Sequence, residues 1–350
     1  MRDRLRGVTP AVVRAALDAS DPLPGASGRG STDMGGFGGV VDDRVVRDVL
    51  GRQPVYTEAG AVDPTADGAW AFAPSDLDDP VVVPPGTVRT AAGDSQRLEL
   101  PEPPVEDPEP AQRAVDDALT GALGLGAEGQ PADTAVAFSG GVDSALVAAG
   151  LPDAPLYVIG FEGSHDIAAA RAAAAEMGRT ADLRVLELNH ETLREAVPRV
   201  AEAINRTNPM DVSIALPLLL VAERVRADGY DRLALGQGAD ELFGGYSKVV
   251  EPAEDHRVEA DTVRGAVSET IDSLPEQLER DVCGLQAVGV DPVTPCLQDR
   301  VVDAALRLPG ELLASGEERK IALRRFARRQ GVLPESVAST DKKAVQYGSY

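Results

Sequence analysis

The chain has 350 residues, of which 43% are hydrophobic and 4% aromatic, and its formal net charge at pH 7 is −23. This length fits one large domain or two smaller ones, and so strong an excess of acid excludes a general nucleic-acid-binding protein, which needs a basic surface. No apolar run approaches the ~20 residues of a membrane span, and the N-terminus lacks the apolar core of a signal peptide. We therefore expect a soluble, cytoplasmic protein that does not bind membranes.

The first part of the chain predicts a small β-rich unit, which we place at residues 1–95. Residues 8–18 show helical spacing of apolar residues, and residues 21–39 are rich in Gly, Ser and Pro, as loops are. Short extended runs separated by Gly, Pro and Asp then follow. These runs are 39–41, 54–57, 69–73 and 81–83.

An acidic, proline-rich stretch follows this unit. Residues 99–110 read Glu-Leu-Pro-Glu-Pro-Pro-Val-Glu-Asp-Pro-Glu-Pro. Such a composition predicts an extended, semi-rigid linker. We place the linker at residues 96–112 and a second domain at residues 113–350.

Helices and strands alternate through most of the second domain. Helices are predicted at 111–123, from 143, and at 166–178, 191–205 and 211–228; strands are predicted at 135–138, 155–160, 183–188 and 232–235. This alternation predicts an α/β fold, with a parallel sheet that carries helices on both faces. From residue 259 onward the chain is expected to be largely helical. Ligands of such sheets bind outside the carboxyl ends of the strands.

The stretch Ser139-Gly140-Gly141-Val-Asp143-Ser144 lies where the predicted strand 135–138 gives way to a helix. Its glycines let the backbone approach an oxyanion, and the free amides of a first helical turn point at such a group. The two serines add hydroxyl donors. The stretch is not a Walker loop, because no GxxxxGK[ST] occurs. It resembles the PP-loop of ATP pyrophosphatases, which cleave ATP between its α and β phosphates; a plain strand-to-helix turn with a helix cap is the alternative.

A second glycine-rich stretch runs from Ala234 to Tyr246, Ala-Leu-Gly-Gln-Gly-Ala-Asp-Glu-Leu-Phe-Gly-Gly-Tyr. A strand ends inside it, and Asp240 then stands at a helix start. Asp143 and Asp240 come from two strand ends, so together they can hold Mg²⁺ against a pyrophosphate. Taken alone, Asp240 would more often be a capping residue.

Together the two stretches resemble the synthetase domain of the asparagine synthetase family, which includes the β-lactam synthetases. The resemblance covers about residues 113–350 and takes in Leu278-Glu-Arg-Asp281 and Thr294-Pro-Cys-Leu297. It implies a fold like that of the adenine nucleotide α-hydrolases, and the use of ATP with Mg²⁺. It also implies contacts with the nucleotide at the strand ends. The positions concerned are Ala137, Ile159, Gly160, Leu235 and Gly236.

The lysines carry weight because the chain otherwise uses arginine as its cation. Three of the four lysines, Lys320, Lys342 and Lys343, fall in the last 31 residues. Lys320 matches a family lysine in a KxxLR helix, and the Lys342-Lys343 pair stands where the family has the lysine of an RxK motif, which implies catalytic roles. A lysine ammonium suits a developing oxyanion. Thr340 replaces the arginine of RxK, which favours Lys342 by spacing alone, and the choice between Lys342 and Lys343 stays open; ordinary solvated lysines are the alternative.

An acid-rich, lysine-poor composition is typical of proteins from salt-in halophiles, whose acidic surfaces keep them solvated. The alternative is an acidic surface for a basic partner. We favour the salt interpretation because the acidic residues are spread along the chain rather than gathered in blocks.

The N-terminal unit resembles a truncated class II glutaminase domain of the same family, in segments 47–56, 71–77 and 83–88. That domain releases ammonia from glutamine with an N-terminal cysteine. Here residue 2 is arginine, and the first cysteine is Cys283. We therefore expect no glutamine hydrolysis by this chain. Free ammonia, another amine, or ammonia from a separate glutaminase partner would supply the nitrogen.

Gln237 departs from the family, because asparagine synthetases carry glutamate there. A glutamine removes a charge and adds an amide donor, which argues against aspartate as the substrate. We expect an AMP-forming ligase, asparagine-synthase-like, that adenylates a small-molecule carboxylate and transfers ammonia or another amine to it. Gln237 joins the three C-terminal lysines as a candidate catalytic residue. The rivals are a PP-loop enzyme with a different substrate and a non-catalytic nucleotide-binding subunit.

Overall fold

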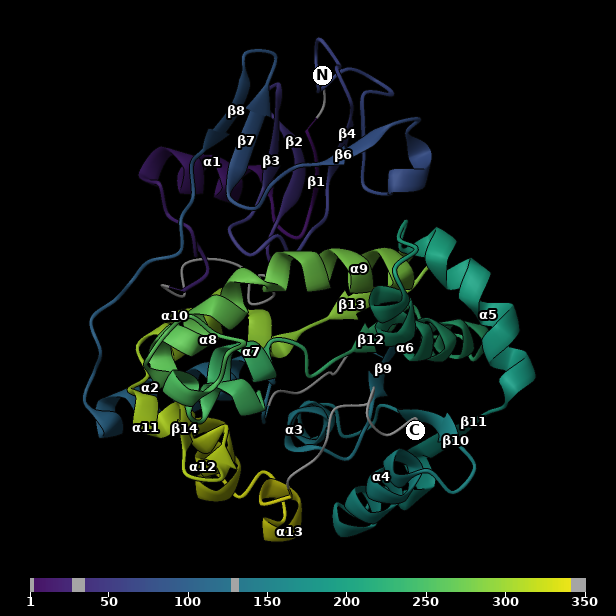
Figure 1. The fold of residues 1–350 in the computed structure, drawn as a ribbon, viewed down its shortest axis with the longest axis vertical. Coiled ribbons are helices and arrows are strands. Elements are labelled where there is room, and N and C mark those ends of the chain that lie inside the picture. Colours follow the sequence, from purple (N-terminus) through teal and green to yellow (C-terminus); the bar gives the residue numbers. More distant parts are fainter. Residues whose placement is uncertain (1–2, 27–34, 127–131, 341–350) are drawn as a thin grey trace.

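The computed structural model describes residues 3–26, 35–126 and 132–340. A β-rich N-terminal part, purple to blue in Figure 1, lies on one side of a larger α/β part. Lys342 and Lys343 lie outside the described residues, so their predicted roles stay predictions.

The N-terminal part contains two antiparallel sheets, with strand orders β1-β2-β3-β7-β8 and β5-β4-β6. This confirms the predicted β-rich unit. Its apolar centre packs Val40, Val45, Val55 and Val83 against Trp70. Helix α1 (Pro10–Ala19) starts with a proline, whose missing N–H has no partner to lose at that position. The strands are β1 (Arg4–Arg6), β2 (Gly38–Val41), β3 (Arg44–Arg47), β4 (Tyr56–Glu58), β5 (Trp70–Ala71), β6 (Pro80–Val82), β7 (Thr87–Thr90) and β8 (Gly93–Gln96).

The segment that joins the two parts differs from the predicted linker at both ends. Strand β8 runs to Gln96, and helix α2 (Pro108–Ala122) begins inside the predicted 96–112 range. Asp107 is extended and Pro108 has a φ suited to a first helical residue, so the helix starts there rather than at residue 111. Residues 99–107 belong to no helix or strand. The domain boundary itself remains a prediction.

A five-stranded sheet forms the centre of the α/β part, in the order β11-β10-β9-β12-β13. Each adjacent pair of strands is parallel, which confirms the predicted sheet. Along β9 the side chains alternate between the two faces, with Ala135 packing among residues of helix α6 and Val136 among those of helix α3. The strands are β9 (Thr134–Ala137), β10 (Leu156–Phe161), β11 (Leu183–Leu188), β12 (Arg232–Ala234) and β13 (Asp291–Val293).

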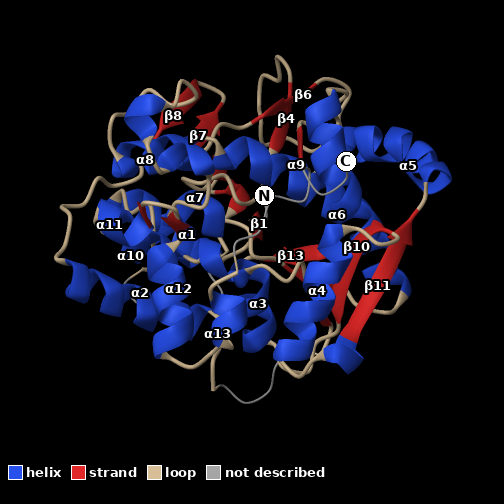
Figure 2. Cartoon of the chain, turned by 60° about the horizontal axis from the view of Figure 1, so that its bottom comes forward, coloured by secondary structure: helices blue, strands red, loops and turns tan. Residues whose placement is uncertain are grey.

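Helices cover both faces of this sheet, as the alternation predicted (Figures 1 and 2). Helices α3 and α4 pack on β9 and β10, and α6 packs on the opposite face. The remaining chain is mostly helical, apart from a hairpin of β14 (Ala314–Ser315) and β15 (Glu318–Arg319). Within the described residues no helix is long and apolar enough to span a membrane. The helices after α2 are α3 (Val142–Gly150), α4 (His165–Glu176), α5 (His190–Ala203), α6 (Pro209–Ala227), α7 (Ala239–Phe243), α8 (Val263–Asp272), α9 (Leu274–Ala287), α10 (Asp299–Leu306), α11 (Gly310–Leu313), α12 (Ile321–Arg329) and α13 (Glu335–Ala338).

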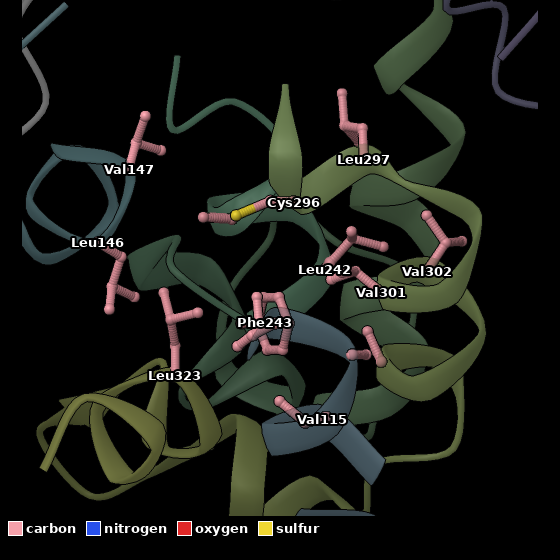
Figure 3. Close-up of a cluster of buried hydrophobic side chains, with 14 of the residues drawn as sticks. Val115, Leu146, Val147, Leu242, Phe243, Cys296, Leu297, Val301, Val302 and Leu323 are labelled. Atoms are coloured by element: carbon pink, nitrogen blue, oxygen red, sulfur yellow. The ribbon is translucent and has the colours of Figure 1, made fainter. Parts of the chain in front are cut away.

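One apolar cluster fixes the helices that will carry polar side chains. Leu146 of α3, Phe243 of α7 and Leu323 of α12 lie in it together with Cys296 (Figure 3). All four are almost fully buried. Each large apolar side chain buried in this way contributes about 1.5–3 kcal/mol. The cluster therefore holds four chain segments, far apart in sequence, in one fixed arrangement.

Candidate active site

The loop at residues 139–144 connects β9 to α3 and is closed on itself by hydrogen bonds. Gly140 has a φ of 77°, and a Cβ there would lie 2.6 Å from the carbonyl oxygen of Ala169 in α4, so only glycine fits. The Ser144 hydroxyl accepts from the Ser139 amide at 3.2 Å and donates to the Gly141 carbonyl at 3.1 Å. Gly141 is extended and α3 begins directly after it. The loop therefore presents the amino end of a nine-residue helix, where backbone amides attract anions.

Three neighbouring strands bring the other predicted nucleotide-binding positions to the same edge of the sheet. Strands β10, β9 and β12 are adjacent and parallel, so their carboxyl ends lie together. Ile159 and Gly160 lie near the end of β10, Ala137 ends β9, and Leu235 follows β12. Gly236 is so close to the first loop that a Cβ on it would lie 2.7 Å from the Cβ of Asp143. The two glycine-rich loops thus touch. The contacts of these positions with a nucleotide remain predictions.

Lys320 joins the two predicted metal ligands. Its ammonium lies 2.5 Å from Asp143 Oδ2 and 2.8 Å from Asp240 Oδ1. Burial alone would lower the pKa of Lys320, but the two carboxylates outweigh it and raise the pKa above its usual value. Lys320 also has a left-handed backbone, with φ 56°, just before α12. Such a conformation costs about 1–3 kcal/mol for a residue other than glycine, and packing of α12 must hold it.

The two carboxylates are oxygen ligands of the kind that a hard cation takes, and in this structure the Lys320 ammonium lies between them. Asp143 Oδ1 is buried and has no hydrogen-bond partner among the described residues, and burial raises the pKa of Asp143 while Lys320 opposes that rise. The Asp240 side chain is 44% exposed, so the pair is open on one side. Where the structure describes the chain, no three His, Cys, Asp or Glu side chains form a metal cluster. Further ligands for Mg²⁺ would have to come from phosphates and water, as this ion prefers.

Gln237 has a single buried partner on helix α9. Its Nε2 donates to Asp281 Oδ2 at 2.6 Å, while its Oε1 is buried and has no hydrogen-bond partner in the described part of the chain. Arg280 also grips Asp281, from Nε at 2.7 Å and from Nη2 at 3.2 Å. Burial raises the pKa of Asp281, although Arg280 and Gln237 act in the opposite direction. Gln237 Oε1 is therefore a buried acceptor that no described residue uses.

Several residues at this site were not assigned a role from the sequence. Asp281 lies in a segment noted only for its resemblance, although a charged residue on a buried helix face usually needs a partner. Tyr246 donates to Glu241 at 2.5 Å and so closes the second loop. Arg324 donates to the carbonyls of Ala338 at 2.7 Å and Thr340 at 3.2 Å, which anchors the chain just before Lys342. In the sequence, Arg324 appeared only as the last letter of the KxxLR match.

Comparison with known proteins gives a consistent result. A family model described as asparagine synthase matches residues 130–282 and 264–350, more than half of the chain. A putative glutamine-hydrolysing asparagine synthetase of Methanocaldococcus jannaschii is 32% identical over 244 residues, which are 60% of this chain and 44% of that protein. The glutamine-hydrolysing asparagine synthetase B of Escherichia coli is 25% identical over 236 residues, 61% of this chain and 41% of that protein. A nodule asparagine synthetase of Pisum sativum is 29% identical over 131 residues, 32% of this chain and 21% of that protein. The matched region spans less than half the length of these curated relatives.

Proposed function

Because the chain belongs to the asparagine synthase family, we propose that it is an ATP-dependent, AMP-forming ligase that converts a small-molecule carboxylate into an amide. The observation that carries this proposal is the meeting of Asp143, Asp240 and Lys320 beside the amino end of α3. Cleavage of a nucleoside triphosphate needs groups of this kind: a helix end that binds anions, two carboxylates that can bind a metal ion, and a buried ammonium.

The first step would join the substrate to AMP. A carboxylate oxygen of the substrate attacks the α-phosphorus of ATP, the bond from that phosphorus to the oxygen bridging to the β-phosphate breaks, and pyrophosphate leaves. The amides at the start of α3 receive the departing pyrophosphate, and Lys320 turns from its carboxylates toward the phosphate oxygens. Asp143 and Asp240 would hold Mg²⁺, which when bound would neutralise charge on the pyrophosphate.

The second step would form the amide. The nitrogen of ammonia or another amine attacks the acyl carbon, the carbon–oxygen bond to AMP breaks, and the nitrogen loses a proton. The buried Gln237 Oε1 can accept an N–H of the incoming amine, since it has no other partner among the described residues. Lys342 or Lys343 remains our candidate for stabilising the tetrahedral oxyanion.

Free ammonia, or ammonia from a separate glutaminase partner, is the proposed nitrogen source. The sequence has two cysteines, Cys283 and Cys296, and both are buried. Burial raises the pKa of the Cys283 thiol to about 11 and that of Cys296 to about 12. A thiol held protonated in this way is a poor nucleophile for opening glutamine.

A screen of carboxylic acids would test the reaction. Purified protein is incubated with ATP, Mg²⁺, ammonium and each acid at high salt, and both AMP and pyrophosphate are measured. We expect one class of acids to give equimolar AMP and pyrophosphate. The Asp143→Asn and Asp240→Asn variants should lose most of this activity, whereas Asp117→Asn, an exposed change on α2, should keep it. A protein that binds ATP but releases neither product with any acid would contradict the proposal.

The nitrogen source needs a separate comparison. With the acid found in the screen, ammonium should support turnover and glutamine should not. Glutamine should become active only when a separate glutaminase is added. Equal rates with ammonium and with glutamine in the isolated chain would overturn the ammonia assignment while leaving the ligase assignment intact.

A further inference from the structure

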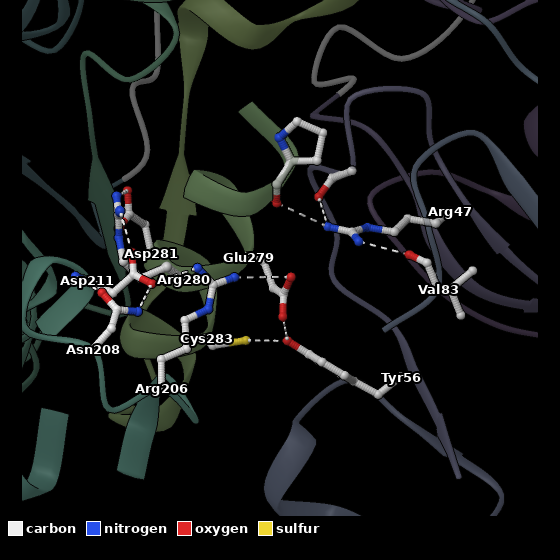
Figure 4. Close-up of polar contacts among 12 residues, drawn as sticks. Arg47, Tyr56, Val83, Arg206, Asn208, Asp211, Glu279, Arg280, Asp281 and Cys283 are labelled. Atoms are coloured by element: carbon white, nitrogen blue, oxygen red, sulfur yellow. Dashed lines mark hydrogen bonds and ion pairs between the residues drawn. The ribbon is translucent and has the colours of Figure 1, made fainter. Parts of the chain in front are cut away.

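Three side chains from the described N-terminal part form hydrogen bonds with helix α9. Arg47 of β3 donates to the Pro275 carbonyl at 3.5 Å, near the start of the helix. Tyr56 of β4 donates to Glu279 Oε1 at 2.8 Å, as Figure 4 shows. Arg6 of β1 donates to Gln286, near the end of the helix. The helix that holds Gln237 through Asp281 is therefore itself held by the N-terminal sheets.

The contact made by Tyr56 continues into the α/β part through side chains alone. The second oxygen of Glu279 pairs with Arg206 Nη2 at 3.3 Å. Arg206 Nη1 donates to Asp211 Oδ2 at 3.1 Å. Asp211 is fixed at the first turn of α6, where its backbone amide donates to the Asn208 side chain at 2.9 Å. Two chain segments outside α9 thus join the same network (Figure 4).

The network then returns to α9 and ends at the active-site loop. Arg280 Nη1 donates to the other oxygen of Asp211 at 3.2 Å. The same guanidinium donates a hydrogen bond to Asp281, which also accepts one from Gln237 at 2.6 Å. An unbroken line of hydrogen bonds and ion pairs therefore runs from the Tyr56 hydroxyl to the Gln237 amide.

These ion pairs are sheltered from solvent. The side chains of Arg280 and Asp281 are 7% and 11% exposed, and those of Glu279, Asp211 and Arg206 are 17%, 19% and 22% exposed. Charged groups with little exposure to water are strongly oriented by their partners. Loss of one partner therefore alters the position of the next group in the network. A network of this kind transmits position better than a row of solvated surface pairs, whose net worth is small.

A second line of contacts reaches the same loop by another route. Arg52 is almost fully buried in the N-terminal part. It donates to Asp48 at 2.8 Å, to Asp299 at 2.7 Å and to the Leu297 carbonyl at 2.7 Å. The Leu297 side chain packs directly against Gly238, the residue after Gln237. The loop is thus supported from the N-terminal part at two neighbouring residues, Gln237 and Gly238.

We propose that the N-terminal β-rich part positions Gln237 for the acyl-transfer step, and that Tyr56 is the positioning residue that carries this support. In this arrangement the β-rich part contributes to catalysis without any chemistry of its own. The inference deepens the proposed ligase function and rests on it, because it assigns Gln237 to the substrate end of that site.

Removal of one hydroxyl tests the proposal. Tyr56→Phe keeps the ring in place but removes the hydroxyl's contacts with Glu279 and Cys283, so the network ends at Glu279. We expect kcat/KM for the carboxylate to fall about tenfold, the size of effect expected when a buried charged group loses a hydrogen bond, while KM for ATP stays within about twofold of wild type. The matched control is Gln286→Ala, which breaks another contact between the N-terminal part and α9 but lies outside the network. It should leave both constants unchanged.

A second measurement does not depend on activity. Hydrogen exchange of the backbone is followed in two peptides, one covering residues 236–246 and one covering residues 139–144. Tyr56→Phe should speed exchange in the first peptide and not in the second, and Gln286→Ala should speed neither. If no acid supports turnover, the ligase proposal fails, and the exchange result alone decides whether Tyr56 supports the loop.

Two outcomes would overturn the positioning role. In the first, Tyr56→Phe lowers kcat/KM for the carboxylate and raises KM for ATP by the same factor. The other is a Tyr56→Phe protein whose exchange in both peptides matches that of Gln286→Ala.

Discussion

Lys320 combines three unusual properties in one side chain. It is buried, it has a left-handed backbone, and it faces two carboxylates from the first turns of different helices. Without a nucleotide, its ammonium fills the space between Asp143 and Asp240 and offsets their mutual repulsion. The same residue would therefore serve the resting protein as a resident cation and the reacting protein as a phosphate ligand.

Lys320→Met separates these two roles. The substitution keeps most of the buried stem but removes the charge, so pyrophosphate release should fall by at least about 100-fold, as when a transition-state donor is lost. Binding of Mn²⁺ without nucleotide, followed by electron paramagnetic resonance, should become stronger because the two carboxylates are no longer neutralised.

Arg328→Met is the matched control, since it removes a positive charge from the exposed face of the same helix. It should change neither measurement. Unaltered pyrophosphate release in Lys320→Met would contradict the catalytic role of Lys320.

Gln237→Glu should create a pH-dependent stability. The new carboxylate would replace an amide donor 2.6 Å from Asp281 Oδ2, and burial already raises the pKa of Asp281. The folded protein would then bind more protons than the unfolded chain above about pH 4, so the free energy of unfolding must fall as pH rises through that window. The melting temperature should drop more between about pH 5 and about pH 8 in the variant than in wild type. Parallel melting curves for the two proteins would contradict this coupling.

The turn between β9 and α3 shows what a single element demands of its sequence. Gly140→Ala would place a methyl group on a left-handed backbone and 2.6 Å from a carbonyl oxygen of α4. We expect a loss of about 2–4 kcal/mol in unfolding free energy, measured by urea denaturation, together with loss of ATP binding. Gly178→Ala is the control, because Gly178 has a similar φ of 70° with no atom near its missing Cβ. It should cost only about 1 kcal/mol, and equal losses in the two variants would contradict the steric argument.

The elements around this turn were predictable to different degrees. Strands β9 to β12 are short, largely apolar runs that alternate with helices, and β9 and β12 lie inside the sheet, so their pattern alone predicted the parallel sheet. Strand β13 was missed because Asp-Pro-Val at the sheet edge has no apolar run. Strand β8, Gly-Asp-Ser-Gln, was missed because an exposed edge strand needs no apolar face. The start of α2 was placed three residues late, because the prolines before residue 111 were assigned to the linker.

The arrangement of the candidate site was predictable where its residues are close in sequence. The loop 139–144 carries its chemistry in six consecutive positions, and Asp240 follows a second loop of the same kind. The pairing of Gln237 with Asp281 could not be predicted, because the fold alone brings these two residues together. The support from Tyr56 is still more remote, since it crosses from one sheet to another.

At the scale of the whole molecule, charge is the dominant feature. A net charge of −23 on 350 residues opposes compaction through self-repulsion. We propose that the protein is adapted to high salt, which shortens the range of this repulsion to about 3 Å at 1 M.

Salt should therefore stabilise the fold. The melting temperature should rise as KCl is increased from about 0.1 M to about 2 M. A variant in which five exposed acids are changed to their amides should respond less, because it has less repulsion to screen. Suitable exposed positions are Asp18, Asp43, Asp67, Asp117 and Glu195. An equal response in both proteins would attribute the salt effect to apolar burial rather than to charge.

The contacts between the N-terminal sheets and α9 should couple the two parts in both directions. Coupling between two sites is reciprocal in free energy. If the β-rich part stabilises the Gln237 loop, a ligand that stabilises this loop must therefore stabilise the interface with the β-rich part by the same amount. A bound acyl-adenylate would then make the two halves of the molecule harder to pull apart. The stability of the contact between the two parts would then show whether a substrate is bound in the active site.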